Sequence, residues 1–457
     1  MNFYTTRALS CRSLSLSGLL GAALLGACGA ETAAPASAAP TGLLPGVSNP
    51  DSPAGSEMPS APPPELVTPI VTASPSENVN TPISLAPGTD GMSTDGMATP
   101  IGKDPVLPPV RVDCSLAPSA TVQVAWDDVN DQDAAWYSTA EALTIAENVL
   151  YYQNPDRGWP KNIDMTARAA ARGEQSMIDN DATTTQIDFL ARVYEASGCS
   201  DYGDAARSGI EYLLDAQYDN GGWPQRFPNP QGYPAHITYN DNAMVHVLEV
   251  LRSVATQTGR FAFVDAALAT AAFSAVQLGI GCILATQVVM DGSRVGWCAQ
   301  HDEVSLAPAQ ARSYELPSLS GSEGAALFQF LMSIDQPSAE VRAAVTGAAA
   351  WFEAVKLTGI RVQQVTDATQ TSGEDRVVVQ DPAAPPLWAR FYELGTDRPI
   401  FSSRCEVAQC ATDPYFMRRY SLAEIENERR VGYAWYGNWP ARALATTYPA
   451  WRERWME

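Results

Sequence analysis

A compact run of oxygen-bearing side chains begins at Asp179, Asn180 and Asp181 and continues through three threonines. A second run contains Asp241, which follows Asp179 by 62 residues. Convergent carboxylate and amide oxygens are the ligands that a hard cation such as Ca²⁺ needs. The same residues could instead cap helices, because Asp and Thr accept hydrogen bonds from the free N–H groups of a helix start. From these residues alone, two interpretations remain: a cation site formed by Asp179, Asn180 and Asp241, or a pair of helix caps.

Two arginines stand among aromatic residues later in the chain. Arg312 precedes Tyr314, and Arg390 lies between Trp388 and Phe391. A guanidinium keeps its proton up to a pKa above about 12, so either residue is suited to hold an anionic ligand such as a carboxylate. Arg390 could also serve only in cation–π packing. By its own chemistry, Arg312 indicates carboxylate binding.

Helices are the elements that must position these residues. Apolar residues recur at helical spacing in seven segments: 139–150, 185–196, 202–217, 242–256, 261–280, 324–334 and 338–357. Alternation typical of a strand is rare, and 376–380 is its best example. These patterns predict a protein that is mostly helical, with short irregular strands in its loops.

The loops between the helices contain a weak repeat. Gly158-Trp159-Pro160 recurs as Gly222-Trp223-Pro224, 64 residues later. That spacing accommodates one helical hairpin with its loops, so we expect hairpins packed around an axis as an α/α toroid. The similar spacing of Asp179 and Asp241 places both acids at the same end of it. Toroids host unrelated chemistries, so the fold alone does not define the reaction.

Taken together, these motifs resemble the family 10 polysaccharide lyases. The matching segments run in the order of that family through 152–162, 179–183, 220–228, 238–241, 297–302, 312–315 and 390–393. The resemblance implies an α/α toroid and a Ca²⁺-dependent pectate lyase that acts on polygalacturonate.

Residue roles follow from the same resemblance. It implies that Arg312 is the Brønsted base, that Asp179 and Asp241 bind Ca²⁺ with Asn180 beside them, and that Arg390 binds a substrate carboxylate. The weaker candidates for subsite contacts are Lys161, Trp223, Arg226 and Tyr314. The reaction would be an anti-β-elimination that removes the proton at C5 and leaves a 4,5-unsaturated oligogalacturonate.

Two other functions fit part of the sequence. A toroid glycoside hydrolase could use Asp179 and Asp241 as paired acid and base. A non-catalytic lipoprotein could capture oligogalacturonate without cleaving it. The net charge of −22 excludes a nucleic acid as partner and requires local cations wherever a polyanion binds. We expect a monomer.

The N-terminal quarter of the chain is predicted to contain an export signal followed by a linker. Residues 1–27 combine Arg7 and Arg12 with a short apolar run, and end in a pattern that resembles a bacterial lipobox before Cys28. The resemblance makes Cys28 the lipidated residue of a protein anchored to the outer membrane or cell surface, although an ordinary cleaved signal that releases a secreted form is the alternative. Residues 28–114 are rich in Pro, Ala and Ser and predict a disordered linker. Residues 115–457 then form the catalytic domain.

Six cysteines remain beyond Cys28, an even number that favours disulfides in an exported protein. Cys405 and Cys410 are close in sequence, and Cys282 with Cys298 is a second plausible pair. Cys114 and Cys199 would then pair by elimination. The absence of a C-x-x-C pattern argues against structural zinc.

Overall fold

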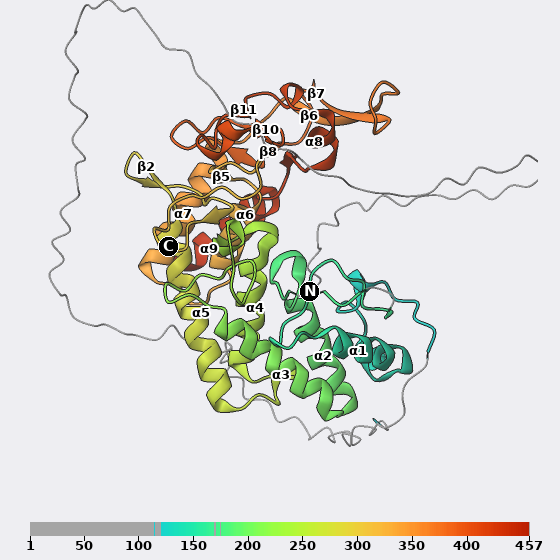
Figure 1. The fold of residues 1–457 in the computed structure, drawn as a ribbon. Helices are drawn as coiled ribbons and strands as arrows, with labels where there is room; N and C mark the ends of the chain where they lie inside the picture. The colour runs from blue at the N-terminus through green and yellow to red at the C-terminus, as the bar shows by residue number, and fades with distance from the viewer. Residues whose placement is uncertain (1–113, 115–119, 169–170, 174, 457) are drawn as a thin grey trace, which may run out of the picture. The chain divides into compact units, whose positions relative to one another are not determined.

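The computed structural model describes residues 114, 120–168, 171–173 and 175–456 (Figure 1). The predicted signal, the lipidation of Cys28 and the linker up to residue 113 lie outside the described residues. The helices of the described part are α1 (Ala140–Tyr152), α2 (Thr184–Ser197), α3 (Ser200–Asp215), α4 (Ala243–Thr256), α5 (Ala266–Thr286), α6 (Glu323–Met332), α7 (Ala339–Ala354), α8 (Asn427–Gly432) and α9 (Tyr448–Trp455).

Seven of these helices, α1 to α7, occupy the seven segments predicted from apolar spacing. Three of them begin at a capping side chain that accepts from a backbone N–H of the first turn: Thr139 for α1, Asp265 for α5 and Ser338 for α7. The predicted start of α5 at residue 261 is five residues too early, because Asp265 caps the helix at Ala266. Helices α8 and α9 are too short to show a clear apolar period and were not predicted.

The strands are short, with one exception. They are β1 (Ile237–Thr238), β2 (Val289–Met290), β3 (Ser293–Arg294), β4 (Gln300–His301), β5 (Leu319–Ser320), β6 (Ile360–Thr366), β7 (Glu374–Gln380), β8 (Trp388–Ala389), β9 (Phe391–Tyr392), β10 (Phe401–Ser402), β11 (Arg418–Arg419) and β12 (Tyr436–Gly437). The exception is the antiparallel hairpin of β6 and β7, in which Ile360 pairs with Gln380 and Thr366 with Glu374. The strand predicted at 376–380 is the second half of β7.

A buried tryptophan follows each odd-numbered helix from α1 to α7. In all four cases the indole N–H donates to a backbone carbonyl of the helix just completed, at 2.7 to 2.8 Å. The pairs are Trp159 with Val149, Trp223 with Leu213, Trp297 with Ile283, and Trp388 with Phe352. The loop repeat seen twice in the sequence is therefore fourfold in the structure, and it fixes where the chain turns after each odd helix.

A glutamine near the end of α1, α3 and α5 ties each of these helices to the next odd one. Its side-chain amide donates both to a carbonyl of its own following loop and to a carbonyl of the next odd helix. The links to the next odd helix run from Gln153 to Ala205, from Gln217 to Ala275 and from Gln287 to Ala344. The odd helices are thus joined in succession by equivalent hydrogen bonds.

Short antiparallel pairs join the loops that follow the odd helices to the segments that precede the even ones. Strand β1, before α4, pairs with β4, after α5, and β5, before α6, pairs with β9, after α7. The further pair of β8 and β12 joins the loop after α7 to the segment before α9. Single bridges extend the series, for example between Pro224 and Ile237. These pairings gather the loops before α2, α4 and α6, and the polar side chains of the predicted site lie in those loops.

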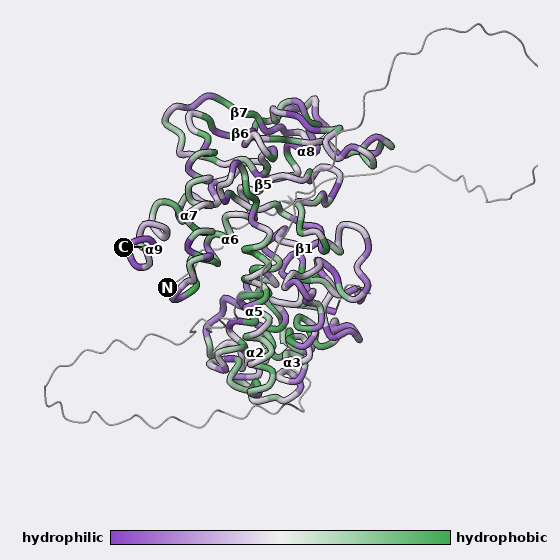
Figure 2. Tube along the Cα trace, turned by 90° about the vertical axis from the view of Figure 1, so that its left-hand side faces the viewer, coloured by the Kyte–Doolittle hydropathy of each residue, from purple (hydrophilic) through white to green (hydrophobic). Residues whose placement is uncertain are grey.

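The hydrophobic core lies between the helices, and α5 is the most apolar of them (Figure 2). By length and composition alone α5 could cross a membrane. However, its buried face packs against α3, α4 and α7, as in the core of a folded domain.

Two of the three predicted disulfides are present, Cys114–Cys199 and Cys405–Cys410. The predicted pair of Cys282 and Cys298 is wrong, because both are buried free thiols. The Cys282 sulfur lies 3.9 Å from the hydroxyl of Tyr239, whereas the Cys298 sulfur faces the carbonyl of Ala309 at 3.7 Å. Spacing in the sequence could not reveal that the two sulfurs face different neighbours.

Candidate active site

The two predicted acid-bearing loops have the same backbone conformation. Asp179–Asp181 and Asn240–Asn242 are single 3-10 turns immediately before α2 and α4, and each contains a residue in the left-handed region. Asn180 and Asp241 both have φ of 51°, a value that Asn and Asp tolerate better than most residues. By conformation Asp241 is therefore the counterpart of Asn180 rather than of Asp179, although both acids lie at the same end of the helices, as predicted.

Asp179 is buried, with 2% of its surface exposed. Its Oδ2 forms an ion pair with Lys161 and accepts a hydrogen bond from the amide of Gln225 at 2.5 Å. Its other oxygen, Oδ1, is buried and has no hydrogen-bond partner among the described residues. A buried carboxylate oxygen without a partner is costly, so this atom is free to bind a ligand that offers positive charge.

Asp241 lies in the same group of charges. Its Oδ2 accepts a hydrogen bond from the amide of Asn240 at 2.7 Å, and its Oδ1 is 3.7 Å from a guanidinium nitrogen of Arg390. Burial, together with the negative charges of Asp179 and Glu323, raises the pKa of Asp241 to about 7, despite the opposing effect of Arg390. Burial and the repulsion by these two neighbours together let Asp241 hold a proton up to near neutral pH.

Arg390 is buried between β8 and β9. Its guanidinium forms an ion pair with Glu323, the first residue of α6, and its Nε is buried without a partner among the described residues. Glu323 was missed by sequence reasoning. It could have been suspected, because α6 is the third even-numbered helix to begin beside the site and Glu323 is the acid of its first turn.

Arg312 is held by Glu315 in a two-pronged pair. Its Nε donates to Oε2 at 2.8 Å, its Nη2 pairs with Oε1, and its backbone N–H donates to Oε2 at 3.1 Å. Burial alone would lower the pKa of Arg312, but the hydrogen bonds and charge of Glu315 outweigh it and raise the pKa further. The pKa of Glu315 is lowered in return, because these same interactions outweigh its burial. At rest, Arg312 is a protonated cation.

Tyr433 connects the two arginines. Its ring lies 4.7 Å from the guanidinium carbon of Arg390 and 5.8 Å from that of Arg312, and its hydroxyl donates to Glu315 Oε1 at 2.7 Å. Tyr433 therefore brings Arg312 beside the group of Asp179, Asp241 and Glu323. It lies more than 100 residues from Arg312 in the chain, so no local pattern could have shown this.

Known proteins resemble this chain over most of its length. A family model described as pectic acid lyase matches residues 153–444. The chain belongs to the pectic acid lyase family. The solved family 10 polysaccharide lyase from Cellvibrio cellulosa is 33% identical, with a TM-score of 0.59 over 71% of this chain and 94% of that one.

A variant of the Cellvibrio cellulosa lyase, solved in complex with trigalacturonic acid, is 32% identical to this chain. It aligns with a TM-score of 0.59 over 71% of this chain and 95% of that one. No curated protein sequence matches the chain. Membership of the pectic acid lyase family makes this protein a pectate lyase, and the glycoside hydrolase and the non-catalytic binding protein are set aside.

Two of the predicted subsite residues lie in the interior of this lyase. Trp223 is fully buried, and its indole N–H donates to the carbonyl of Leu213. Tyr314 is 2% exposed, and its ring contacts the guanidinium of Arg312 at 5.1 Å. Both rings contribute to the packing of the interior, because aromatic side chains bury a large apolar area.

The other two subsite candidates lie nearer to solvent. Lys161 is partly exposed and pairs with Asp179, so it borders the acid group directly. Arg226 is half-buried and donates to the side chain of Gln175 at 2.9 Å. Asn180 is exposed and donates to the side chain of Asn162 at 2.7 Å, which leaves its own amide oxygen available.

The donor set of the lyase suits a hard cation. It offers a buried carboxylate oxygen on Asp179 with no hydrogen-bond partner among the described residues, a second carboxylate on Asp241 whose pKa is raised by burial and by neighbouring negative charges, and the nearby amide of Asn180. Oxygen donors of this kind select Ca²⁺ or Mg²⁺ over softer metals. The residues present therefore fit the cation that the resemblance implies.

A tighter group of possible metal ligands lies elsewhere. Among the described residues, only His236, Asp302 and Glu303 bring three such ligand atoms within 4.8 Å of one another. His236 pairs with Glu303 at 2.9 Å, and one oxygen of Asp302 accepts hydrogen bonds from Val304 and Ser305. These hydrogen bonds explain the cluster as side chains that close a turn. The carboxylates of Asp179, Asp241 and Glu323 do not bring three ligand atoms as close together.

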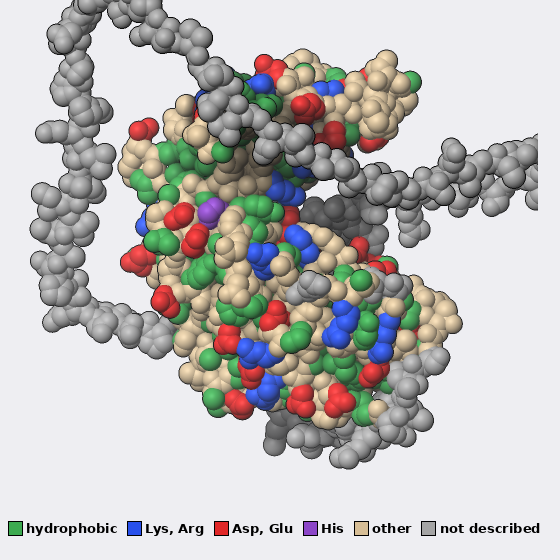
Figure 3. Space-filling model, in the orientation of Figure 1, with side chains coloured by type: hydrophobic (Ala, Val, Ile, Leu, Met, Phe, Trp, Pro, Cys, Tyr) green, Lys and Arg blue, Asp and Glu red, His purple; other side chains and the backbone are tan. Residues whose placement is uncertain are grey.

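The charge of the protein favours an anionic substrate only at the candidate active site. On the face shown in Figure 3, Lys and Arg side chains are interspersed with Asp and Glu side chains. The net charge of the chain is −22, so the polymer is repelled by the molecule as a whole. Local cations, in the form of Lys161, Arg312 and Arg390, therefore have to attract it.

Proposed function

We propose that this lyase cleaves α-1,4-polygalacturonate by Ca²⁺-dependent anti-β-elimination, with Arg312 as the base. The observation that carries the proposal is the grouping of Asp179, Asp241 and Glu323 with Arg390 beside the Arg312–Glu315 pair. The complex of the Cellvibrio cellulosa lyase with trigalacturonic acid supports the substrate class. Asp179, Asp241 and Asn180 would hold the cation.

The reaction moves two protons and two electron pairs. The C5–H bond of a galacturonate breaks, its proton passes to a neutral Arg312, and its electrons form the C4=C5 double bond. The C4–O bond breaks in turn, and the departing oxygen takes a proton from water. When bound, Ca²⁺ would neutralise the substrate carboxylate and so make the C5 proton more acidic. Arg390 would add positive charge beside the same carboxylate as negative charge develops on it.

The resting state of Arg312 shapes the pH dependence of this mechanism. A base must be unprotonated, and Glu315 keeps Arg312 protonated. We therefore infer that activity rises with pH well into the alkaline range. The alternative role, in which Arg312 stays a cation and only binds a carboxylate, predicts no such rise.

The remaining parts of the proposal concern architecture and location. The succession of tryptophan and glutamine hydrogen bonds supports closure of the helical hairpins into an α/α toroid. The lipobox-like sequence before Cys28 supports export and a lipid anchor at the outer membrane or cell surface. We propose a monomer that acts on pectin from that anchor.

One assay tests the central claim. The purified chain is incubated with polygalacturonate, with and without a chelator, and the ultraviolet absorbance of the unsaturated product is followed. We expect a rise that the chelator abolishes and that added Ca²⁺ restores. Shortening of the polymer without new absorbance, or a rise indifferent to the chelator, would contradict the proposal. The variant Asp179→Asn should behave like the chelated enzyme.

A further inference from the structure

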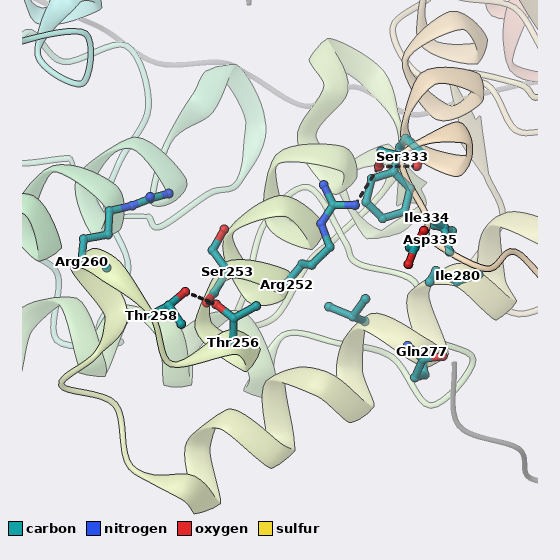
Figure 4. A pocket seen from close by; sticks show the side chains of 13 residues that line it. Arg252, Ser253, Thr256, Thr258, Arg260, Gln277, Ile280, Ser333, Ile334 and Asp335 are labelled. Carbon is teal, nitrogen blue, oxygen red and sulfur yellow. Dashed lines mark hydrogen bonds between the residues drawn. The ribbon is translucent and has the colours of Figure 1, made fainter. Parts of the chain in front are cut away.

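A cavity of about 420 Å³ opens between the C-terminal parts of α4 and α6 and the middle of α5 (Figure 4). The candidate active site lies at the opposite ends of these helices, where α4 and α6 begin. Arg252, which lines the cavity, follows the first residue of α4 by nine positions, or about 14 Å along the helix. The cavity is therefore separate from the catalytic group.

Arg252 carries a charge in this cavity that no acid neutralises. Its Nη1 donates to the hydroxyl of Ser333 at 2.7 Å, and its guanidinium carbon lies 5.2 Å from the ring centre of Phe330. Among the described residues it has no carboxylate partner within ion-pair distance. Burial lowers the pKa of Arg252, with only Glu249 of its own helix opposing. A guanidinium has five N–H donors, so most of them remain available.

The other charged residues that line the cavity are already paired. Arg260, which also lines the cavity, forms an ion pair with Asp188. Asp335 pairs with Arg454 at 2.9 Å, which offsets its negative charge. Among the described residues that line the cavity, Arg252 is therefore the cation that is not paired with an acid.

The rest of the lining matches a sugar acid. Hydroxyl groups come from Ser253, Thr256 and Thr258, and an amide comes from Gln277. Apolar surface is provided by residues such as Ile280. A carboxylate would pair with the planar fork of a guanidinium, while ring hydroxyls and the apolar face of a sugar would meet the remaining groups.

We propose that this cavity is a second carboxylate site, which binds a uronate unit at a distance from the catalytic group. The choice of a uronate rests on the proposed function, whereas the carboxylate chemistry rests on Arg252 alone. Such a site would add a second point of attachment for an anionic polymer that the molecule as a whole repels. If Arg252 served only to complete the end of α6 through Ser333, no anion would bind.

Chemical modification of the full chain tests the proposal at single-residue resolution. Phenylglyoxal reacts with accessible arginines, and mass spectrometry of the peptides gives the rate at Arg252 and, as an internal control, at Arg260. With a chelator present to prevent cleavage, we expect digalacturonate to slow modification of Arg252 at least tenfold and that of Arg260 less than twofold. The neutral disaccharide galactobiose should protect neither residue.

Calorimetric titration with digalacturonate provides the second measurement. We expect the variant Arg252→Gln to lose one class of binding site, while Arg260→Gln in the same cavity retains it. If Arg252→Gln does not fold, the protection experiment on the unaltered chain still decides. Equal protection of Arg252 by inorganic phosphate would overturn the uronate assignment, and no protection by any anion would overturn the site. Either result leaves the proposed function intact, because that function is read from calcium-dependent product absorbance.

Discussion

The pair of Arg312 and Glu315 allows a test of whether the arginine is a base. The perturbation is Glu315→Gln, which keeps the shape of the side chain and removes its charge. Two unit charges about 4 Å apart interact with about 4 kcal/mol at an effective dielectric constant of about 20, which corresponds to roughly three pKa units. The Arg312 side chain is 40% exposed, so solvent screens part of this effect. We expect the pKa of Arg312 to fall by about one to two units.

The sign of the effect on activity follows from the role of a base. Below its pKa, the fraction of neutral Arg312 rises as that pKa falls, so the acid limb of the kcat profile should move to lower pH by the same one to two units. The limiting kcat should fall by up to about tenfold, because Arg312 also loses part of its orientation. Stopped-flow absorbance of the unsaturated product between neutral and strongly alkaline pH measures both quantities.

Glu393→Gln is the matched control for this experiment. Glu393 is a buried carboxylate that forms an ion pair with Arg418 at 2.7 Å, and it has no contact with Arg312. Its variant should leave the pH profile in place. If Glu315→Gln raised KM and left the acid limb where it was, Arg312 would be a carboxylate-binding cation and the assignment as base would be refuted.

Four further predictions rest on the structure. Because the pKa of Asp241 is raised to about 7, a cation must displace its proton at lower pH, so Ca²⁺ affinity should rise up to tenfold per pH unit below 7 and level off above it, as calorimetry can measure. Without a bound cation, the raised pKa of Asp241 makes the folded state less stable as pH rises from about 4 to 7, because the buried carboxyl must then lose its proton. The variant Asp241→Asn should remove about 1–2 kcal/mol of this loss of stability, after allowance for solvent screening. The Tm of the variant should therefore fall less than that of the unaltered protein over this pH range. Replacement of the buried Trp223 by Ala should cost about 3–5 kcal/mol in the free energy of unfolding; an unchanged denaturation midpoint together with a raised KM would return Trp223 to the subsites. Loss of the Cys114–Cys199 bridge, which closes 85 residues, should cost roughly 4–5 kcal/mol and more than loss of Cys405–Cys410, which closes five; equal shifts in urea midpoint would contradict this order.

The sequence alone determined the elements and the ingredients of the site. Helices α1 to α7 could be read from apolar spacing, because a helix that faces a core repeats its apolar residues at a fixed period. The motif series indicated the family, and the similar spacing of the Trp loops and of Asp179 and Asp241 placed both acids at one end of the helices. Local chemistry also showed that Arg312 suits an anionic partner.

The tertiary structure decided which residues meet and in which state. Glu323 and Tyr433 join the site through contacts with Arg390 and Glu315, which lie far from them in the chain, and the sequence does not show which distant segments meet. Burial matters as well, because it places Trp223 and Tyr314, two candidates for subsite contacts, in the interior, and together with the charges of Asp179 and Glu323 it raises the pKa of Asp241 to about 7. The predicted bridge between Cys282 and Cys298 is wrong because a disulfide depends on how two sulfurs face each other in the fold and not on their separation in sequence.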